Sequence, residues 1–286
     1  MLDVLLNPLA YSFMQRALLA SALVGGLCAI VGCYVVLRGM SFLGDALAHA
    51  ILPGLAIAFL LDGDLFVAAL LTAILVASGI GYVGRGGRLR EDAAIGVVFS
   101  GAFALGVALI SSAPSYQTDL THILFGNVLG VTDRDLLLAI GFGAVVLAVV
   151  VALYKEWLAF TFDPIFASSI KLPVGKLHYL LMILLAVTVV VSLRTVGVGL
   201  VAAMLITPAA AASMLTRRLP RMMAVSAFIG VTSSIVGLYV SFYGNLSAGA
   251  SIVLTCSAMF LIALIFSPRD GMLARLRTAR RTRGAD

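Results

Sequence analysis

Nine stretches of about 20 predominantly apolar residues divide the chain, and they limit its fold more than any other feature. A helix needs about 20 such residues to cross the hydrocarbon layer of a membrane, which is roughly 30 Å thick. Backbone polar groups find no water in that layer, so an apolar run of this length must cross it as a helix. Only 11% of the residues are charged, whereas soluble domains contain about 25%. The sequence therefore predicts an all-α bundle of transmembrane helices.

The predicted bundle has nine spans, although eight or ten also fit the pattern. Residues 1–286 are expected to form a single transmembrane domain that ends in a basic cytoplasmic tail at residues 268–286. The first run follows Arg16 without a small-residue cleavage site, so we interpret it as a retained span. The segment Asp119–Gly130 is too short to cross and fits a half-helix or an interfacial helix. The nine spans are placed at residues 14–37, 42–61, 65–84, 93–112, 135–154, 177–193, 197–216, 222–243 and 249–267.

Basic residues are distributed unevenly between the two sides of this bundle. With nine spans and a cytoplasmic C-terminus, only Arg16, Arg134 and Arg194 of the 19 Lys and Arg residues face outward. Such a bias marks the cytoplasmic side of membrane proteins. The net charge of +6 is therefore assigned to contact with anionic membrane lipid and not to nucleic acid. The cysteines, expected to be small buried residues without a metal or disulfide role, are Cys28, Cys33 and Cys256.

A carboxylate and an imidazole inside one predicted span are the most informative polar side chains. Asp45 and His49 are four residues apart, so they share one face of a helix. Ionisable groups are costly in a membrane unless something compensates them. Carboxylate oxygen and imidazole nitrogen are both ligands for Mn²⁺, Fe²⁺ and Zn²⁺. The pattern alone leaves three interpretations open: contact with a metal ion, a structural pair, or a proton relay.

Two prolines are predicted to interrupt helices and to support the same ion site. Proline has no backbone N–H, so Pro53 deprives the carbonyl of His49 of its usual helical partner. Pro208 would release the carbonyl of Met204 in the span at residues 197–216 in the same way. Interrupted transmembrane helices commonly use freed carbonyls to bind ions.

Five other polar residues receive no role in the predicted site. Glu91 and Asp92 open a helix, where negative charge meets the positive end of the helix dipole. His178 is expected to be an interfacial anchor at the start of a span. Asp119 and His122, in the short segment between spans, can shape the entry of the ion or contact the binding protein, or they can form a cap or a turn.

Seven short segments, each weak alone, occur in an order that is highly specific. They are Phe13–Ala17, Leu37–Gly54, Glu91–Gly96, His122–Asn127, Thr161–Pro164, Leu205–Ala209 and Gly237–Tyr239. Through them the chain resembles the permeases of bacterial manganese, zinc and iron ABC importers, which work with a metal-binding lipoprotein. The resemblance extends from about Phe13 to Ser267.

The resemblance implies a homodimer with the ion path on the dimer axis. Asp45 and His49 from two copies would then supply four side-chain ligands to a passing ion. No cofactor is expected to be bound permanently, because the divalent metal ion is the transported substrate. The segment His122–Asn127 resembles the manganese and iron permeases more than the zinc permeases. Mn²⁺ is therefore the preferred substrate, with Zn²⁺ or Fe²⁺ as alternatives. The other implied partner is an extracytoplasmic metal-binding lipoprotein, and the implied location is the bacterial inner or plasma membrane.

The resemblance also places the docking of an ABC ATPase subunit at the cytoplasmic loop of residues 155–176. Asp163 can cap a short helix that has Pro164 at its first position. Phe162 and Phe166 would give this helix an apolar face. The alternative is an ordinary interfacial helix.

The expected function is therefore that of a permease in an ATP-driven metal importer. The segment Gly84-Arg-Gly-Gly-Arg88 has glycines but lacks the lysine and hydroxyl of a phosphate-binding loop. The chain is accordingly not expected to be an enzyme, and a separate subunit hydrolyses ATP. The alternative is a proton-coupled metal carrier that uses Asp45 and His49 as a relay. An intramembrane enzyme is disfavoured, because the three histidines are scattered and H-E-x-x-H is absent.

Overall fold

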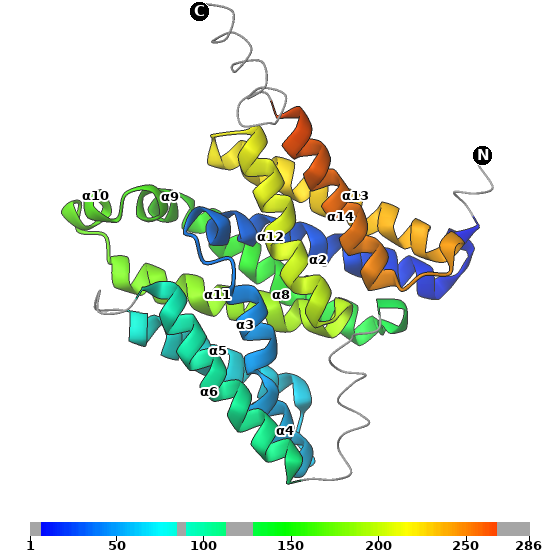
Figure 1. Ribbon diagram of the computed structural model, residues 1–286, viewed down its shortest axis with the longest axis horizontal. Coiled ribbons are helices and arrows are strands. Elements are labelled where there is room, and N and C mark those ends of the chain that lie inside the picture. Colours follow the sequence, from blue (N-terminus) through cyan, green and yellow to red (C-terminus); the bar gives the residue numbers. More distant parts are fainter. Residues whose placement is uncertain (1–6, 85–89, 113–127, 268–286) are drawn as a thin grey trace, which may run out of the picture.

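The computed structural model describes residues 7–84, 90–112 and 128–267, and every regular element in these ranges is a helix (Figure 1). Nine segments of the described chain are long and apolar enough to cross a membrane, which confirms the predicted fold class and the preferred number of spans. The spanning helices are α2 (Ser12–Leu37), α3 (Leu43–Ala50) followed by α4 (Leu52–Leu60), α5 (Leu65–Gly84), α6 (Glu91–Ser111), α8 (Asp133–Ala152), α11 (Val174–Val196), α12 (Val198–Leu215), α13 (Leu219–Gly244) and α14 (Ala248–Phe266).

Four shorter helices join or precede the spans. They are η1 (Pro8–Ala10), η3 (Val128–Gly130), α9 (Tyr154–Phe162) and α10 (Pro164–Ser169). The predicted tail at residues 268–286 lies outside the described residues, as do Asp119 and His122. Of the expected half-helix, only the last turn, η3, belongs to the described part.

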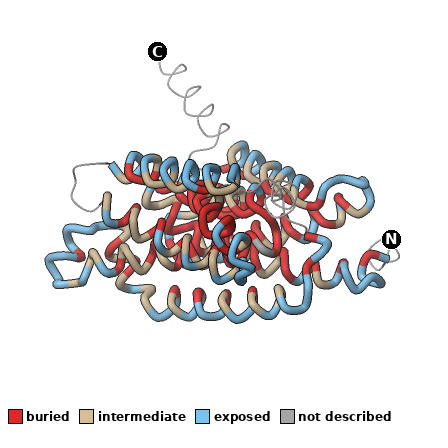
Figure 2. The backbone as a smooth tube through the Cα atoms, turned by 90° about the horizontal axis from the view of Figure 1, so that it is seen from below, coloured by how far each residue is buried: buried red, intermediate tan, exposed pale blue. Residues whose placement is uncertain are grey.

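Helix α2 lies in the middle of the bundle and packs against α8, α11, α12 and α13. Buried residues gather in the interior and exposed ones on the outer faces (Figure 2). Close packing in lipid depends on small residues, because no hydrophobic force drives helices together there. Gly32 shows this most clearly: a Cβ atom at this position would overlap the carbonyl oxygen of Leu205 in α12.

The second span is interrupted at Ile51, between α3 and α4. Pro53 is buried in the first turn of α4, where a missing N–H is tolerated. The break therefore occurs where the sequence predicts it. At this break the N–H of Ile51 lies toward the carbonyl of His49, two residues before it. That this carbonyl supports an ion site stays a prediction.

Pro208 does not break its helix, contrary to the prediction. Helix α12 continues from Val198 to Leu215 with Pro208 inside it. A proline removes only one helical hydrogen bond, and neighbouring helices can hold a transmembrane helix together around it. Pro208 is buried, and the buried residues Leu205 and Ala209 beside it fix this part of α12 against the bundle.

Contacts at the two ends of the bundle show that consecutive spans run in alternating directions. At one end, Arg38 after α2 pairs with Glu91 at the start of α6. At the other end, Arg16 pairs with Asp133, and Arg134 pairs with Asp64. We call these the Arg38 end and the Asp133 end. Each contact joins helix ends that nine alternating crossings place on the same side.

Helices α9 and α10 project from the Arg38 end of the bundle (Figure 1). The N–H of Phe166 donates a hydrogen bond of 2.8 Å to Oδ1 of Asp163, and Pro164 is the first residue of α10. The predicted capped helix is therefore confirmed. The sequence did not indicate α9, whose side chains Trp157 and Phe160 are buried against the bundle.

All three cysteines are free and buried, as the sequence predicts. Cys28 lies 3.2 Å from the hydroxyl of Ser192. The thiol of Cys33 donates to the carbonyl of Ala29 within its own helix. These thiols serve as small packing residues.

Candidate functional site

Asp45 and His49 lie side by side on α3, as their spacing predicts. Nε2 of His49 is 3.8 Å from Oδ1 of Asp45. This distance is too long for a hydrogen bond but short enough for two ligands of one ion. Ligand atoms about 2.1 Å from a common ion lie roughly 3.0–3.4 Å apart at octahedral to tetrahedral angles. A small side-chain adjustment would therefore let both groups hold the same cation.

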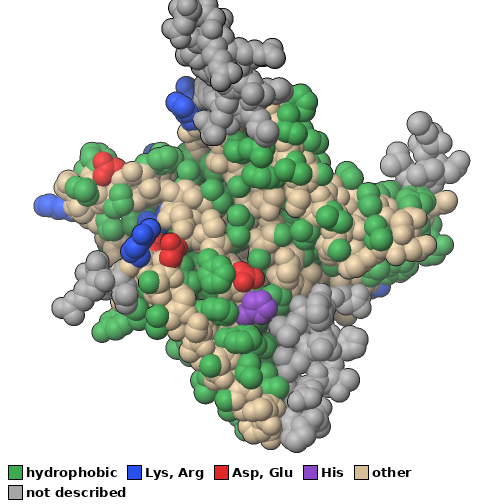
Figure 3. Space-filling model, viewed as in Figure 1, with side chains coloured by type: hydrophobic (Ala, Val, Ile, Leu, Met, Phe, Trp, Pro, Cys, Tyr) green, Lys and Arg blue, Asp and Glu red, His purple; other side chains and the backbone are tan. Residues whose placement is uncertain are grey.

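The pair occupies an open position on the single chain. The side chain of His49 is 35% exposed and that of Asp45 is 39% exposed. The space-filling view shows a histidine beside an acidic side chain over α3 and α6, at the middle of one face of the bundle (Figure 3). The ring of His49 meets the ring of Phe103 in α6 edge to face, with centroids 6.2 Å apart. Phe103 thereby restricts the orientation of the imidazole.

One chain does not complete a metal site within its described residues. No group of three or more His, Cys, Asp and Glu side chains is close enough there to hold an ion. A divalent transition metal ion usually takes at least four ligands. Within the described residues the pair thus offers two side-chain ligands, fewer than such an ion usually takes.

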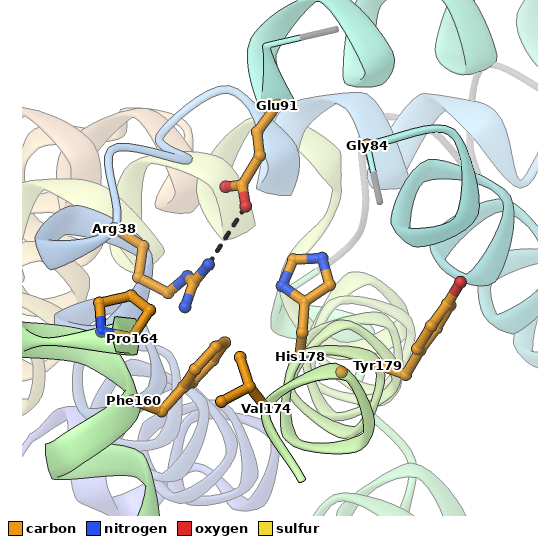
Figure 4. Close-up of a pocket in the computed structure, with 9 residues that line it drawn as sticks. Arg38, Gly84, Glu91, Phe160, Pro164, Val174, His178 and Tyr179 are labelled. Atoms are coloured by element: carbon orange, nitrogen blue, oxygen red, sulfur yellow. Dashed lines mark hydrogen bonds and ion pairs between the residues drawn. The ribbon is translucent and has the colours of Figure 1, made fainter. Parts of the chain in front are cut away.

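A second polar cluster, which the sequence did not reveal, lies at the Arg38 end. Nη2 of Arg38 is 3.1 Å from Oε1 of Glu91, and the guanidinium carbon lies 4.0 Å from the centre of the Phe160 ring. Both contacts border a cavity of about 200 Å³ (Figure 4). Its lining residues are Arg38, Gly84, Glu91, Phe160, Pro164, Val174, Gly175, His178 and Tyr179.

His178 lines this cavity instead of serving only as an interfacial anchor. Its ring lies at an edge-to-face angle to Phe160, with centroids 6.3 Å apart. The half-buried imidazole points toward Glu91 in the close-up view (Figure 4). One signal for this cluster was present in the sequence, because alternating spans place Arg38, Glu91 and His178 at the same end of the bundle.

These features define a class of protein: a multi-span helical membrane protein with an acid–imidazole pair inside one span and a projecting helix at one end. The sequence pattern of the ABC 3 transport family matches residues 10–267. The chain therefore belongs to the ABC 3 transport family. It is a multi-pass membrane subunit of an ABC transport system and not a catalytic subunit.

Relatives of known assignment cover nearly the whole chain. A manganese transport system membrane protein, MntC, of Halalkalibacterium halodurans is 47% identical over 267 residues, which are 93% of this chain and 91% of the relative. A probable iron transport system membrane protein of Haemophilus influenzae is 42% identical and covers 93% of this chain and 98% of its own length.

A solved structure confirms the architecture. A chain of PsaBC from Streptococcus pneumoniae, in complex with Fab, is similar to this chain with a TM-score of 0.82 and 40% identity. The similarity covers 94% of this chain and 96% of that chain. The helical arrangement described above is therefore shared with this solved chain.

Proposed function

We propose that the chain is the permease of an ATP-driven importer for a divalent transition metal ion, with Mn²⁺ as the preferred substrate. The observation that carries this proposal is the open Asp45–His49 pair in an apolar span. Among the described residues neither side chain has a hydrogen bond, so a satisfied structural pair does not explain their presence. A passing cation would offset the carboxylate charge and accept both ligands.

Two copies of the chain are proposed to complete the site. The pair lies on a face of the single chain and supplies only two ligands. A second copy related by a twofold axis would bring another carboxylate and imidazole to the same place. Four side-chain ligands and two negative charges suit a divalent ion, and loose contacts allow its release. The assignments of the relatives to manganese and iron transport support this choice of substrate.

The Arg38 end is proposed to face the cytoplasm, where an ATPase subunit docks. Positive charge concentrates in the connections at this end, as the cytoplasmic side of a bacterial membrane requires. The projecting helix α10 exposes apolar side chains there, including Phe166, which is 54% exposed, and Ile165, which is 79% exposed. An apolar cleft on the ATPase would bury them. The metal-binding lipoprotein would then approach the Asp133 end.

The proposed function is tested by transport into liposomes that contain the permease with its ATPase, with the metal-binding lipoprotein added outside. We expect Mn²⁺ to accumulate only when ATP is enclosed in the liposomes, where it reaches the ATPase. The accumulation should persist when the proton gradient is abolished. Uptake that stops only when the proton gradient is dissipated would instead identify a proton-coupled carrier. Parallel measurements with Zn²⁺ and Fe²⁺ rank the three ions, and absence of Mn²⁺ uptake would contradict the preferred substrate.

Replacing Phe166 by Asp is expected to weaken binding of the ATPase at least about tenfold, because a charge would enter a desolvated apolar contact, where hot-spot residues contribute about 2 kcal/mol or more. Co-purification and ATPase titration measure the effect. Leu61→Asp, an exposed apolar residue in the turn between α4 and α5 at the Asp133 end, is the matched control and should leave binding unchanged. Equal binding by Phe166→Asp and the unaltered chain would remove α10 as the docking site.

A further inference from the structure

We infer that Arg38 is a positioning residue that links movement of α9 and α10 to the helices that hold Asp45 and His49. The inference rests on the proposed function, since it assumes that an ATPase acts on α10. It assigns a role to a cluster that lies at the Arg38 end, away from the ion pair along α3. Three elements meet at this one guanidinium: α2, α6 and α9.

The first contact joins Arg38 to α9. The guanidinium lies over the Phe160 ring at 4.0 Å, and the Phe160 side chain is 2% exposed. A planar guanidinium over an aromatic face is a directional contact that lysine reproduces poorly. Two further polar atoms at the α2–α9 contact, Tyr34 Oη and Trp157 Nε1, are buried without a hydrogen-bond partner among the described residues. The stacked guanidinium and the edge-to-face contact of the Tyr34 and Trp157 rings both attach α9 to the α2 region.

The second contact joins Arg38 to α6. Nη2 of Arg38 donates to Oε1 of Glu91 at 3.1 Å, and the Arg38 side chain is only 12% exposed. Glu91 is the first residue of α6. The same helix carries Phe103, whose ring contacts His49. A displacement of Arg38 would therefore reach the imidazole through α6.

A stiff turn joins Arg38 to α3. The N–H of Met40 donates to the carbonyl of Val35, and the N–H of Gly39 donates to the carbonyl of Val36. This pair of bonds is the Schellman arrangement of a helix end, and Gly39 supplies the left-handed backbone with φ of 70°. The N–H of Leu43, the first residue of α3, then donates to the carbonyl of Met40 at 2.9 Å. Hydrogen bonds thus span the turn between Arg38 and the helix of Asp45.

The cavity beside this cluster gives α9 and α10 room to move. The cavity has a volume of about 200 Å³ and lies between Arg38 and Glu91 on one side and the start of α11, with His178 and Tyr179, on the other (Figure 4). A closely packed interior would resist a shift of α9. Here the polar and stacking contacts of Arg38 can follow α9 while the cavity changes shape. The ATPase would consequently act on Asp45 and His49 through two routes, α3 and α6.

The test compares Mn²⁺ ions imported per ATP hydrolysed by the complete transporter in liposomes. Arg38→Gln and Glu91→Gln are each expected to lower this ratio about fivefold. This factor is at the lower end of the range found for coupling between distant sites. ATP hydrolysis itself should stay within about twofold, because α10 still binds the ATPase. The double variant should be no worse than either single variant, since both remove the same link. Arg38→Lys should restore part of the ratio by keeping the charge but not the planar stack.

Arg16→Gln is the matched control, because it removes an ion pair of similar length at the Asp133 end. It should leave the ratio unchanged. An unchanged ratio in Arg38→Gln, a parallel fall of hydrolysis and transport, or additive losses in the double variant would each overturn the inference. If Arg38→Gln does not assemble, Arg38→Lys and Glu91→Gln decide by the same ratio. Failure of the unaltered transporter to import Mn²⁺ would contradict the proposed function, whereas normal import with an unaffected ratio would contradict only the role of Arg38.

Discussion

Uptake of Mn²⁺ is expected to fall at least about 100-fold when Asp45 is replaced by Asn or His49 by Ala. Loss of a residue that only hydrogen-bonds to a metal ligand already lowers metal affinity or activity about 10–100-fold, and these two residues are the proposed ligands themselves. In the proposed dimer His49→Ala removes two of four side-chain ligands, and Asp45→Asn replaces two carboxylates by amides, which are weaker ligands. Asp45→Asn also removes two negative charges that would offset the ion. Asn has nearly the same shape as Asp, so the fold should persist. Metal accumulation in cells that lack the native chain, with each variant reintroduced, measures the effect.

Asp62→Asn is the matched control for this prediction. Asp62 lies in the exposed turn between α4 and α5 with φ of 50°, a conformation that Asn also adopts readily. It makes the same chemical change outside the proposed ion path and should preserve uptake. Undiminished accumulation by both Asp45→Asn and His49→Ala would remove these residues from the site.

Gly32→Ala is expected to prevent normal assembly of the bundle. The added Cβ atom would overlap the carbonyl oxygen of Leu205 and lie 2.8 Å from its carbonyl carbon. These atoms belong to the backbone of α12, so relief requires that α2 and α12 separate. We expect a loss of about 3 kcal/mol or more, the upper part of the range for overpacked interiors. The measurements are the yield of monodisperse protein in detergent and its thermal unfolding midpoint, which should fall by roughly 6–12 °C.

Gly141→Ala in α8 provides the comparison. No atom lies within 4 Å of a Cβ atom built at this position, apart from its own helix. Ala favours a helix over Gly, so this variant should be as stable as the unaltered chain. An equal yield and unfolding midpoint for Gly32→Ala and Gly141→Ala would show that α2 and α12 can move apart without loss.

The spans could be predicted because lipid requires long apolar helices whatever their tertiary contacts. Their ends were less predictable where polar residues belong to the helix. The span predicted to begin at residue 135 begins at Asp133, because Thr132 and Asp135 form a capping box ahead of the apolar run. The Thr-x-x-Asp pattern carries that signal. Pro53 and Pro208 look alike in sequence, yet the span with Pro53 is interrupted whereas Pro208 lies inside a continuous helix.

The pairing of Asp45 with His49 could be predicted, because four residues make one turn of a helix. Their position on an open face could not, since a hydropathy pattern does not show which helices cover α3. The link between Arg38 and Glu91 joins residues 53 positions apart. Such a contact depends on how α2, α6 and α9 pack, and the periodicity of residues within one helix does not predict it.

The burial of every native thiol has a practical consequence for tracing the path of the ion. Cys28, Cys33 and Cys256 are each at most 1% exposed, and buried thiols in apolar surroundings react slowly. A membrane-impermeant maleimide added to intact cells would therefore report on a single introduced cysteine without prior removal of the natural ones. Cysteines placed along the exposed side of α6, from Val97 to Val107, would map how far the reagent reaches from the outer side of the membrane in an otherwise unaltered chain.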